Sequence, residues 1–265
     1  MVAGKLLAGE RGGGVDPWFR NVRVRHRDKA HGVQRVISRA WLCDPVMKQI
    51  AERLVLDKGA IAQRIRFSAV FKARFKKYIQ ELTGNQRNRI KDLASAKHRF
   101  SSHAAPFGRA VLYFVPLLRC AQSILDERGP RSAEGRDAQA WLEQVTDASV
   151  LLMAMMADCA DESLMCCRLF DRSVKYKSAV RDELTVCCLQ RVTWLFEERG
   201  AMTTGYTAYM VQTLSSKRTI VTHGRPRFIG GPGFLSPGNV KQCFDRMQNW
   251  LQLCRHTVRA ELPDF

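Results

Sequence analysis

The sequence predicts a mainly α-helical protein: a multi-helix bundle, of one unit or of two helical subdomains, with a small extended or hairpin element near residues 217–230. Three observations favour this fold class. The chain has 265 residues, 46% of them hydrophobic, which is enough for a substantial core. Apolar side chains recur every three or four residues over most of its length. Gly, Pro and N-cap residues stand where these patterns begin and end.

The chain begins with a basic N-terminal arm, predicted over residues 1–43, which is Gly-rich at its start. A basic helical subdomain is expected over residues 44–129. It opens at Asp44, because an aspartate followed by proline is typical of an N-cap and a first helical residue. This first helix is expected to run through Lys58.

Two basic helices are expected next. The apolar pattern from Ala60 to Leu82 predicts one amphipathic helix ended by Gly84, with its cations on the far side and flanks. The apolar positions are Ile61, Ile65, Phe71, Phe75, Ile79 and Leu82. A second basic helix is expected from Gln86 to Arg99.

The end of this subdomain is marked by proline and glycine. Pro116 lies within the apolar segment from Phe107 to Leu125 and predicts a kink or two short helices, because proline cannot supply a backbone N–H. Gly129 and Pro130 are the clearest boundary in the chain.

A second helical subdomain is expected over residues 130–265. A helical stripe from Trp141 to Phe170 predicts one helix, or two with a break near Asp158 to Glu162. The segment from Asp182 to Arg199 is apolar on nearly all sides, which predicts a central buried helix.

The last part of the chain mixes turn signals with one strong helix. Residues 205–215 fit either helix or strand, and Thr219 to Thr222 with Arg227 to Ile229 predict a hairpin or an extended loop. Gly230 to Gly233 is expected to be loop. The best-defined pattern predicts a C-terminal amphipathic helix over residues 237–261.

The net charge is strongly positive and uneven. The chain has 43 Lys and Arg against 25 Asp and Glu, a balance of +18, and residues 1–119 alone carry +17 of it. Most of the cations are Arg, which binds phosphate in a bidentate manner. A clustered excess of this kind indicates a surface for an anionic partner.

The candidate anion-binding residues lie in the arm and in the two basic helices. They are Arg20, Arg23, Arg25, Arg27, Arg66, Lys72, Arg74, Lys76, Lys77, Arg87, Arg89, Lys91, Lys97 and Arg99. Such residues bind polyanions without sequence preference and in a salt-dependent way.

No motif in the sequence predicts catalysis, a cofactor or a metal site. The nine cysteines mostly fall at apolar helical positions, which indicates buried thiols and a reducing compartment. Cys43, at a helix start, is the one candidate nucleophile. Gly230 to Gly233 lacks the Lys and Ser/Thr of a phosphate-binding loop. The Gly-Arg-Pro sequence at residues 224–226 fits a polar hairpin turn, with a DNA minor-groove hook as the alternative.

These properties together favour a non-enzymatic structural protein. A cationic, all-helical chain of this size with buried thiols is similar in build to viral matrix and nucleocapsid proteins, a likeness of build alone. The expected partners are RNA or ribonucleoprotein, or else an anionic membrane surface, together with further copies of the chain.

Two other functions stay open: an Arg-rich subunit of a large organellar assembly such as a ribosome or respiratory complex, and an enzyme with an unrecognised site. The expected location is the cytoplasm, the nucleus or a virion. The Arg-rich, acid-poor residues 17–41 keep a mitochondrial transit segment, and so the mitochondrial matrix, as an alternative. No stretch is long and apolar enough to predict a membrane span.

Overall fold

The computed structural model describes residues 36–37, 39–84, 92–93, 101–171 and 178–261, and it confirms a mainly helical fold with a small antiparallel hairpin. The elements in chain order are α3 (Pro45–Ala51) with a π-helical continuation (Glu52–Leu56), α4 (Ile61–Phe67), α5 (Ala69–Thr83), α6 (Ser101–Leu112), α7 (Phe114–Arg128), α8 (Ala133–Gln144), α9 (Asp147–Asp171), α10 (Ser178–Phe196), α11 (Gly205–Thr213), β1 (Arg218–Thr222), β2 (Arg225–Ile229) and α12 (Pro237–Glu261).

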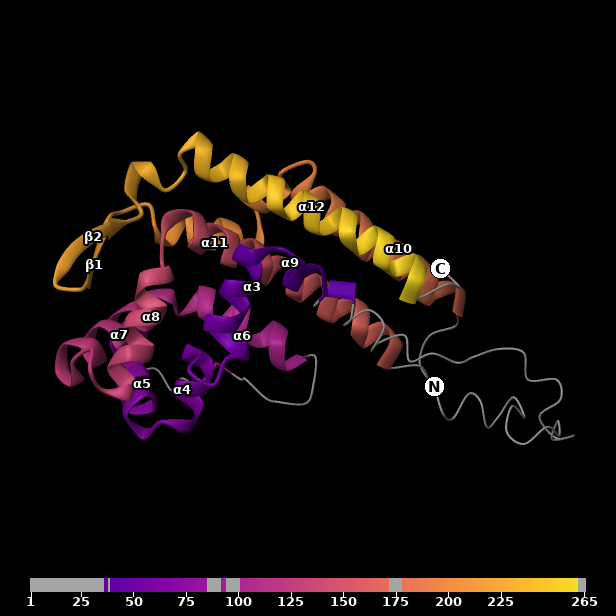
Figure 1. Cartoon of the computed structure of the whole chain (residues 1–265). Helices are drawn as coiled ribbons and strands as arrows, with labels where there is room; N and C mark the ends of the chain where they lie inside the picture. The colour runs from indigo at the N-terminus through magenta and orange to yellow at the C-terminus, as the bar shows by residue number, and fades with distance from the viewer. Residues whose placement is uncertain (1–35, 38, 85–91, 94–100, 172–177, 262–265) are drawn as a thin grey trace, which may run out of the picture.

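Helix α9 is the central element of the core. It packs against α3, α6, α10, α11 and α12, and Figure 1 shows α10 and α12 running alongside it. Leu151, Leu152, Met155 and Met156 on different sides of α9 are all at most 1% exposed. Burying one such side chain contributes about 1.5–3 kcal/mol. An apolar helix of this length is therefore stable only with neighbours around it.

The prediction that residues 182–199 form the central buried helix is wrong. Helix α10 packs on α9 and α12 and buries Val192, Leu195 and Phe196, but Val186 and Leu189 are 49% and 45% exposed. The prediction rested on composition, and composition does not distinguish an apolar helix at the surface of a bundle from one at its centre.

The stripe from Trp141 to Phe170 is broken earlier than predicted. The chain turns between α8 and α9, where the backbone N–H of Thr146 donates to Ser149 Oγ (2.8 Å) and the N–H of Ser149 donates to Thr146 Oγ1 (3.2 Å). This reciprocal pair caps the start of α9 in the manner of a capping box. Helix α9 then continues through Asp158 to Glu162, where a break was the alternative.

Asp158 explains why α9 can carry a carboxylate in the core. Its side chain, 5% exposed, caps the N-terminus of α11. Asp158 Oδ1 accepts from the N–H of Tyr206 (2.6 Å), and Oδ2 accepts from both the N–H (3.0 Å) and the hydroxyl (2.6 Å) of Thr207. Gly205, with φ +71°, precedes them, and a Cβ there would overlap Asp158 Oδ1. Segments far apart in the sequence are thus joined.

The amphipathic segment from Ala60 to Leu82 forms two helices, not one. Ser68 is extended (φ −94°, ψ 123°) and separates α4 from α5. Serine has a low preference for helix interiors, because its hydroxyl group can hydrogen-bond nearby backbone groups in non-helical conformations. Gly84 ends α5 in the left-handed conformation, as predicted. Leu82 is not part of the core, since it is 55% exposed.

The predicted helix from Gln86 to Arg99 lies largely outside the described residues. Asp92 and Leu93, which are described, are not helical, so an uninterrupted helix over this range is wrong. The prediction of two helices around Pro116 is confirmed, because α6 and α7 meet at Tyr113 and Pro116 lies in the first turn of α7.

The hairpin and the last helix follow the predictions closely. β1 and β2 are antiparallel, and His223 and Gly224 with φ of 51° and 69° form the two-residue turn between them. Residues 205–215 are resolved in favour of a helix, α11. Gly231–Gly233 is a single 3-10 turn and not a plain loop. Helix α12 has the predicted bounds, and the N–H of Asn239 donates to Ser236 Oγ (3.4 Å) at its start.

One connected hydrophobic cluster runs from Val36 to Cys254 and includes residues of the predicted arm and of both predicted subdomains. The predicted arm extends to residue 43, but residues 39–43 are helical and Ala40 and Trp41 are buried. The last part of the predicted arm therefore belongs to the folded core. The division into two subdomains stays a prediction. Within the described residues, no helix combines the length and the apolar character needed to cross a membrane.

Candidate anion-binding surface

Five of the candidate cations lie in the described residues, and four of them form an exposed group. Arg66 at the end of α4 and Lys72, Lys76 and Lys77 on α5 are all exposed. None of these four forms an ion pair with a described residue. We call them the cationic face.

Arg20, Arg23, Arg25, Arg27, Arg87, Arg89, Lys91, Lys97 and Arg99 lie outside the described residues.

The burial of the opposite side of α5 creates the cationic face. Phe71, Phe75 and Ile79, at spacings of four, are at most 2% exposed and pack toward α7 and the core. At 3.6 residues per turn, the lysines between them must point away from that side. The lysines of α5 therefore lie on its exposed side, since the apolar side is buried.

Arg74, the fifth candidate, has a different environment. It is half-buried on the flank of α5 next to α7, and its guanidinium forms an ion pair with Glu127. Arg119 of α7 forms a second ion pair with Glu81 of α5 (2.8 Å). Both pairs join these two helices. Because both are partly exposed, each contributes at most about 1 kcal/mol.

A cleft of about 760 Å³ lies beside these pairs, between α5, α7 and β1. Four cations and two carboxylates line it, together with polar groups and Tyr78: the cations are Arg74, Arg119, Lys217 and Arg218, and the carboxylates are Asp126 and Glu127. Arg119 Cζ lies 4.6 Å from the centroid of the Tyr78 ring, and Lys77 Nζ lies 5.6 Å from it. Tyr78 and Lys77 thus connect the cleft to the cationic face.

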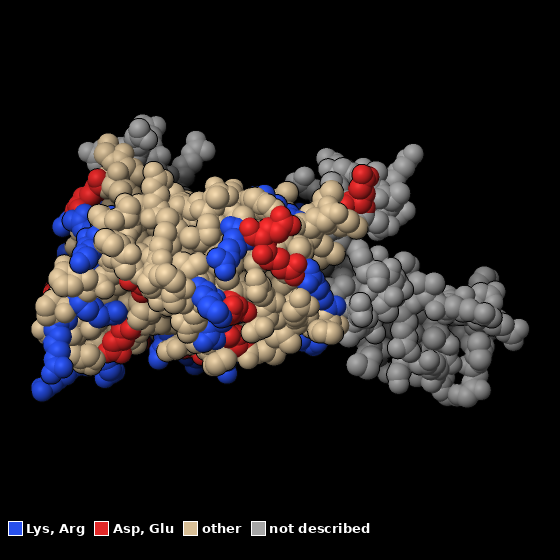
Figure 2. All heavy atoms as spheres, turned by 90° about the horizontal axis from the view of Figure 1, so that it is seen from above, with Lys and Arg blue, Asp and Glu red and all other residues tan. Residues whose placement is uncertain are grey.

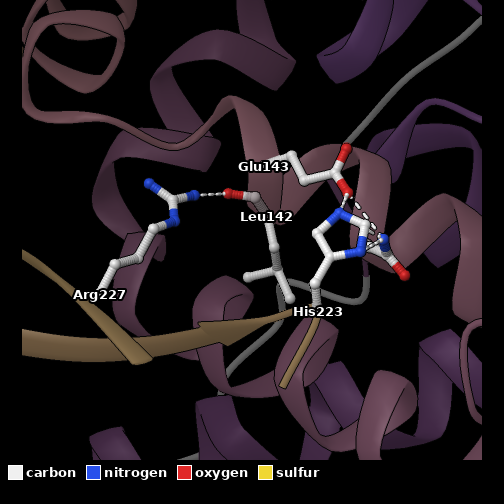
Figure 3. Close-up of polar contacts among 5 residues, drawn as sticks. Leu142, Glu143, His223 and Arg227 are labelled. Carbon is white, nitrogen blue, oxygen red and sulfur yellow. Dashed lines mark hydrogen bonds and ion pairs between the residues drawn. The ribbon is translucent and has the colours of Figure 1, made fainter. Parts of the chain in front are cut away.

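The hairpin that carries two of these cations is fastened to α8 (Figure 3). Arg227 of β2 donates to the carbonyl oxygens of Leu142 and Val145, which lie at the C-terminal end of α8. This burial lowers the pKa of the guanidinium. At the turn, His223 Nε2 lies 2.6 Å from Glu143 Oε1.

These contacts make the Gly-Arg-Pro segment a hairpin element. The turn prediction is confirmed, because Gly224 is the second residue of the two-residue turn and Arg225 and Pro226 begin β2. Arg225, the arginine of this segment, is exposed, so the minor-groove hook stays an untested alternative. On the cleft side, Gln122 Oε1 of α7 accepts from the N–H of Val221 (2.8 Å). The hairpin is thus held on both sides, which fixes Lys217 and Arg218 at the cleft.

Sequence reasoning missed Arg119, Lys217 and Arg218. They are scattered along the chain and come together only in the fold. The one available signal was Lys217-Arg218 directly before a predicted strand.

A second face of the molecule contrasts with this region. Figure 2, seen from above, shows a broad uncharged area with basic and acidic side chains next to each other around it. Ion pairs on α12 have this character: Lys241 with Asp245 (2.6 Å) and Arg255 with Glu197, directly after α10 (2.6 Å). Charges that neutralise each other in this way offer little attraction to a polyanion.

Most of the thiols are buried. All nine cysteines are described, none forms a disulfide, and six are buried: Cys120, Cys159, Cys166, Cys167, Cys243 and Cys254. Cys43, the candidate nucleophile, is exposed. In the part of the chain that the structure describes, no three His, Cys, Asp or Glu side chains are grouped so that they could hold a metal ion.

Comparisons with protein-family models, with curated proteins and with solved structures find no match to this chain.

Proposed function

We propose that the protein is a non-enzymatic structural protein that binds RNA, free or as ribonucleoprotein, through the cationic face and the cleft beside it. The observation that carries the proposal is the exposed cationic face, whose four cations have no carboxylate partner among the described residues. Elsewhere, Arg74, Arg119 and Arg255 are neutralised by ion pairs. Cations kept apart from carboxylates are suited to bind phosphates.

RNA is favoured over a membrane surface. A helix that inserts into a bilayer interface presents an apolar side to it, and α5 buries its apolar side in the core through Phe71, Phe75 and Ile79. Beside Arg66, the ring of Phe67 is 67% exposed and lies 5.2 Å from the guanidinium. A single exposed aromatic ring among cations suits base stacking, because every base has a flat face.

Self-association is the second part of the proposal. Val186 and Leu189 of α10, with Met165 of α9, are exposed apolar side chains remote in sequence from the cationic face. A protein that coats RNA needs contacts between copies as well as contacts to phosphate. Such a protein would resemble matrix and nucleocapsid proteins in role as in build. The thiols suit a reducing compartment, namely cytoplasm, nucleus or virion.

A matched pair of charge reversals tests RNA binding. Lys76→Glu with Lys77→Glu changes the cationic face, while Arg168→Glu with Lys241→Glu makes the same change in net charge on α9 and α12. For single-stranded RNA, each phosphate contact makes the logarithm of affinity fall by about 0.7 for every tenfold rise in salt concentration. Between 1 M and 0.1 M salt, two contacts therefore contribute about 25-fold in affinity, so their loss is expected to weaken binding at 0.1 M salt by about that factor. Fluorescence anisotropy with labelled RNA measures the affinity of both double variants.

The control variant is expected to bind RNA within about threefold of the wild type. Equal weakening by both variants would show that overall charge, and not this face, determines binding. Vesicles containing phosphatidylserine, titrated at the same salt, decide between the partners. Binding to vesicles but not to RNA would refute the RNA assignment.

A further inference from the structure

Arg218, which lines the cleft between α5, α7 and β1, has a hydrogen-bond donor that no described residue satisfies. Arg218 Nη2 donates to the carbonyl oxygen of Thr213 (3.3 Å). Its Nε–H is shielded from solvent and has no acceptor among the described residues. A shielded donor without an acceptor is unfavourable. An anionic group entering the cleft would draw the guanidinium toward it and would supply acceptors for its fork of N–H groups.

Lys217 lies next to Arg218 and is held by the base of the hairpin. Gly231 has φ +73°, and a Cβ at that position would contact the side-chain stem of Lys217. The N–H of Gly231 donates to the carbonyl oxygen of Leu214 (2.8 Å), which closes the hairpin base. Lys217 is exposed, and no described carboxylate pairs with it. The base of the hairpin therefore sets the backbone position of both neighbouring cations at the cleft.

The opposite wall of the cleft offers a flat surface and hydroxyl groups. Arg119 lies over the Tyr78 ring, and planes of this kind stack on nucleobases. Ser123 and Thr219 also line the cleft. The cleft is open to solvent, and its volume of about 760 Å³ leaves room for a nucleotide unit to lie in it.

The two carboxylates of the cleft indicate where a phosphate would lie. Glu127 is engaged by Arg74, and Asp126 Oδ1 accepts from Gln122 Nε2 (2.8 Å). Both belong to the C-terminal half of α7, so they repel phosphate from that side. The phosphate position is left to the β1 side, where Lys217 and Arg218 stand.

We infer that this cleft binds a single-stranded segment of the RNA, with a phosphate on Lys217 and Arg218 and a base against Tyr78 and Arg119. The inference rests on the proposed function and specifies the form of RNA. A double helix keeps its bases stacked inside, so it can offer the cleft phosphates but no base. Single-stranded RNA offers both.

The test compares Arg218→Gln with Arg225→Gln. Both remove one positive charge from the hairpin, but Arg225 lies on β2, beside the turn, and does not line the cleft. Anisotropy with a short labelled oligouridylate is measured across a salt series, with a thermal melt of each variant to verify folding. We expect Arg218→Gln to weaken binding about fivefold at 0.1 M salt and to reduce the salt slope by about 0.7, and Arg225→Gln to leave both unchanged.

Three outcomes overturn the inference while RNA binding itself stands: Arg218→Gln binds like the wild type, a duplex of equal length binds as tightly as the single strand, or inorganic polyphosphate of equal charge competes as well as the oligonucleotide. Failure of the wild type to bind any RNA overturns the proposed function instead. If the wild type bound vesicles but not RNA, and Arg218→Gln no longer bound vesicles, the cleft would be assigned to a lipid phosphate. That result would overturn the RNA assignment.

Discussion

Asp158 links the central helix to α11, and its replacement by Asn removes the charge while it keeps the shape. An amide has one acceptor oxygen and one donor nitrogen, whereas the two carboxylate oxygens accept three hydrogen bonds from Tyr206 and Thr207. In either orientation of the amide, a buried N–H of α11 faces an NH₂ group. One unsatisfied buried donor costs about 1–3 kcal/mol, so we expect Asp158→Asn to lower the free energy of unfolding by that amount at pH 7.

The pH dependence makes this prediction sharper. Burial is the main cause that raises the pKa of Asp158 from 3.8 to about 6, and the hydrogen bonds from Thr207 and Tyr206 oppose the rise. The folded protein therefore binds a proton more tightly than the unfolded chain, and this group stabilises the fold as pH falls through 6 toward 4. Between pH 7 and pH 5 the wild type gains about 1.4 kcal/mol from it, and Asp158→Asn does not.

Urea denaturation at pH 7 and pH 5 measures both effects. The matched control is Asp161→Asn, which removes the same charge from an exposed position one turn further along α9. The difference in unfolding free energy between the wild type and Asp158→Asn is expected to be about 1.4 kcal/mol larger at pH 5 than at pH 7. For Asp161→Asn it is expected to change little. The reasoning would be refuted by an Asp158→Asn variant as stable as the wild type at both pH values.

Two further predictions concern the folded core. Gly135→Ala is expected to destabilise the protein by about 1–3 kcal/mol, although Ala favours helix formation, because a Cβ would overlap the carbonyl oxygen of Gly129; a higher melting temperature for the variant would contradict this. In the native protein, an aromatic disulfide reagent should modify the exposed thiols of Cys43 and Cys187 rapidly. Cys120, whose pKa burial raises to about 12, should react only after denaturation, and its rapid reaction in the folded state would show that α7 is packed differently.

The local parts of the fold could be predicted from the sequence because their signals are local. Asp44, which accepts from the N–H groups of Val46 and Met47 (2.8 and 2.9 Å), caps α3 as expected. The hairpin turn at His223 and Gly224 and the start of α12 after Ser236 are equally local. In each case two to four neighbouring residues determine the backbone conformation.

The errors have the opposite origin. The burial of α9 and the exposure of Leu189 depend on how many neighbours each helix packs against, which no single helix encodes. In the sequence, Asp158 indicated a possible end of a helix. Its role as a buried cap depends on the hydrogen bond from Tyr206 of α11, which lies 48 residues further along the chain. The ion pair of Arg74 with Glu127 is separated by 53 residues. Interactions of this range follow from the tertiary fold.

The same division applies to the candidate surface. The exposed lysines of α5 follow from its helical period, so they could be identified in advance. The cleft requires α5, α7 and β1 together, and the cations Arg119 and Arg218 gain significance only there. A charge count locates a basic region, but the fold decides which of its cations are paired with carboxylates.

The salt dependence of RNA binding by the unmodified protein tests the central claim most directly. If the four cations of the cationic face each contact a phosphate, a plot of the logarithm of affinity against the logarithm of salt concentration has a slope of about −2.8 or steeper for single-stranded RNA. Isothermal anisotropy titrations from 50 to 300 mM salt measure it. No detectable binding at the lowest salt, or a slope near zero, would contradict the account.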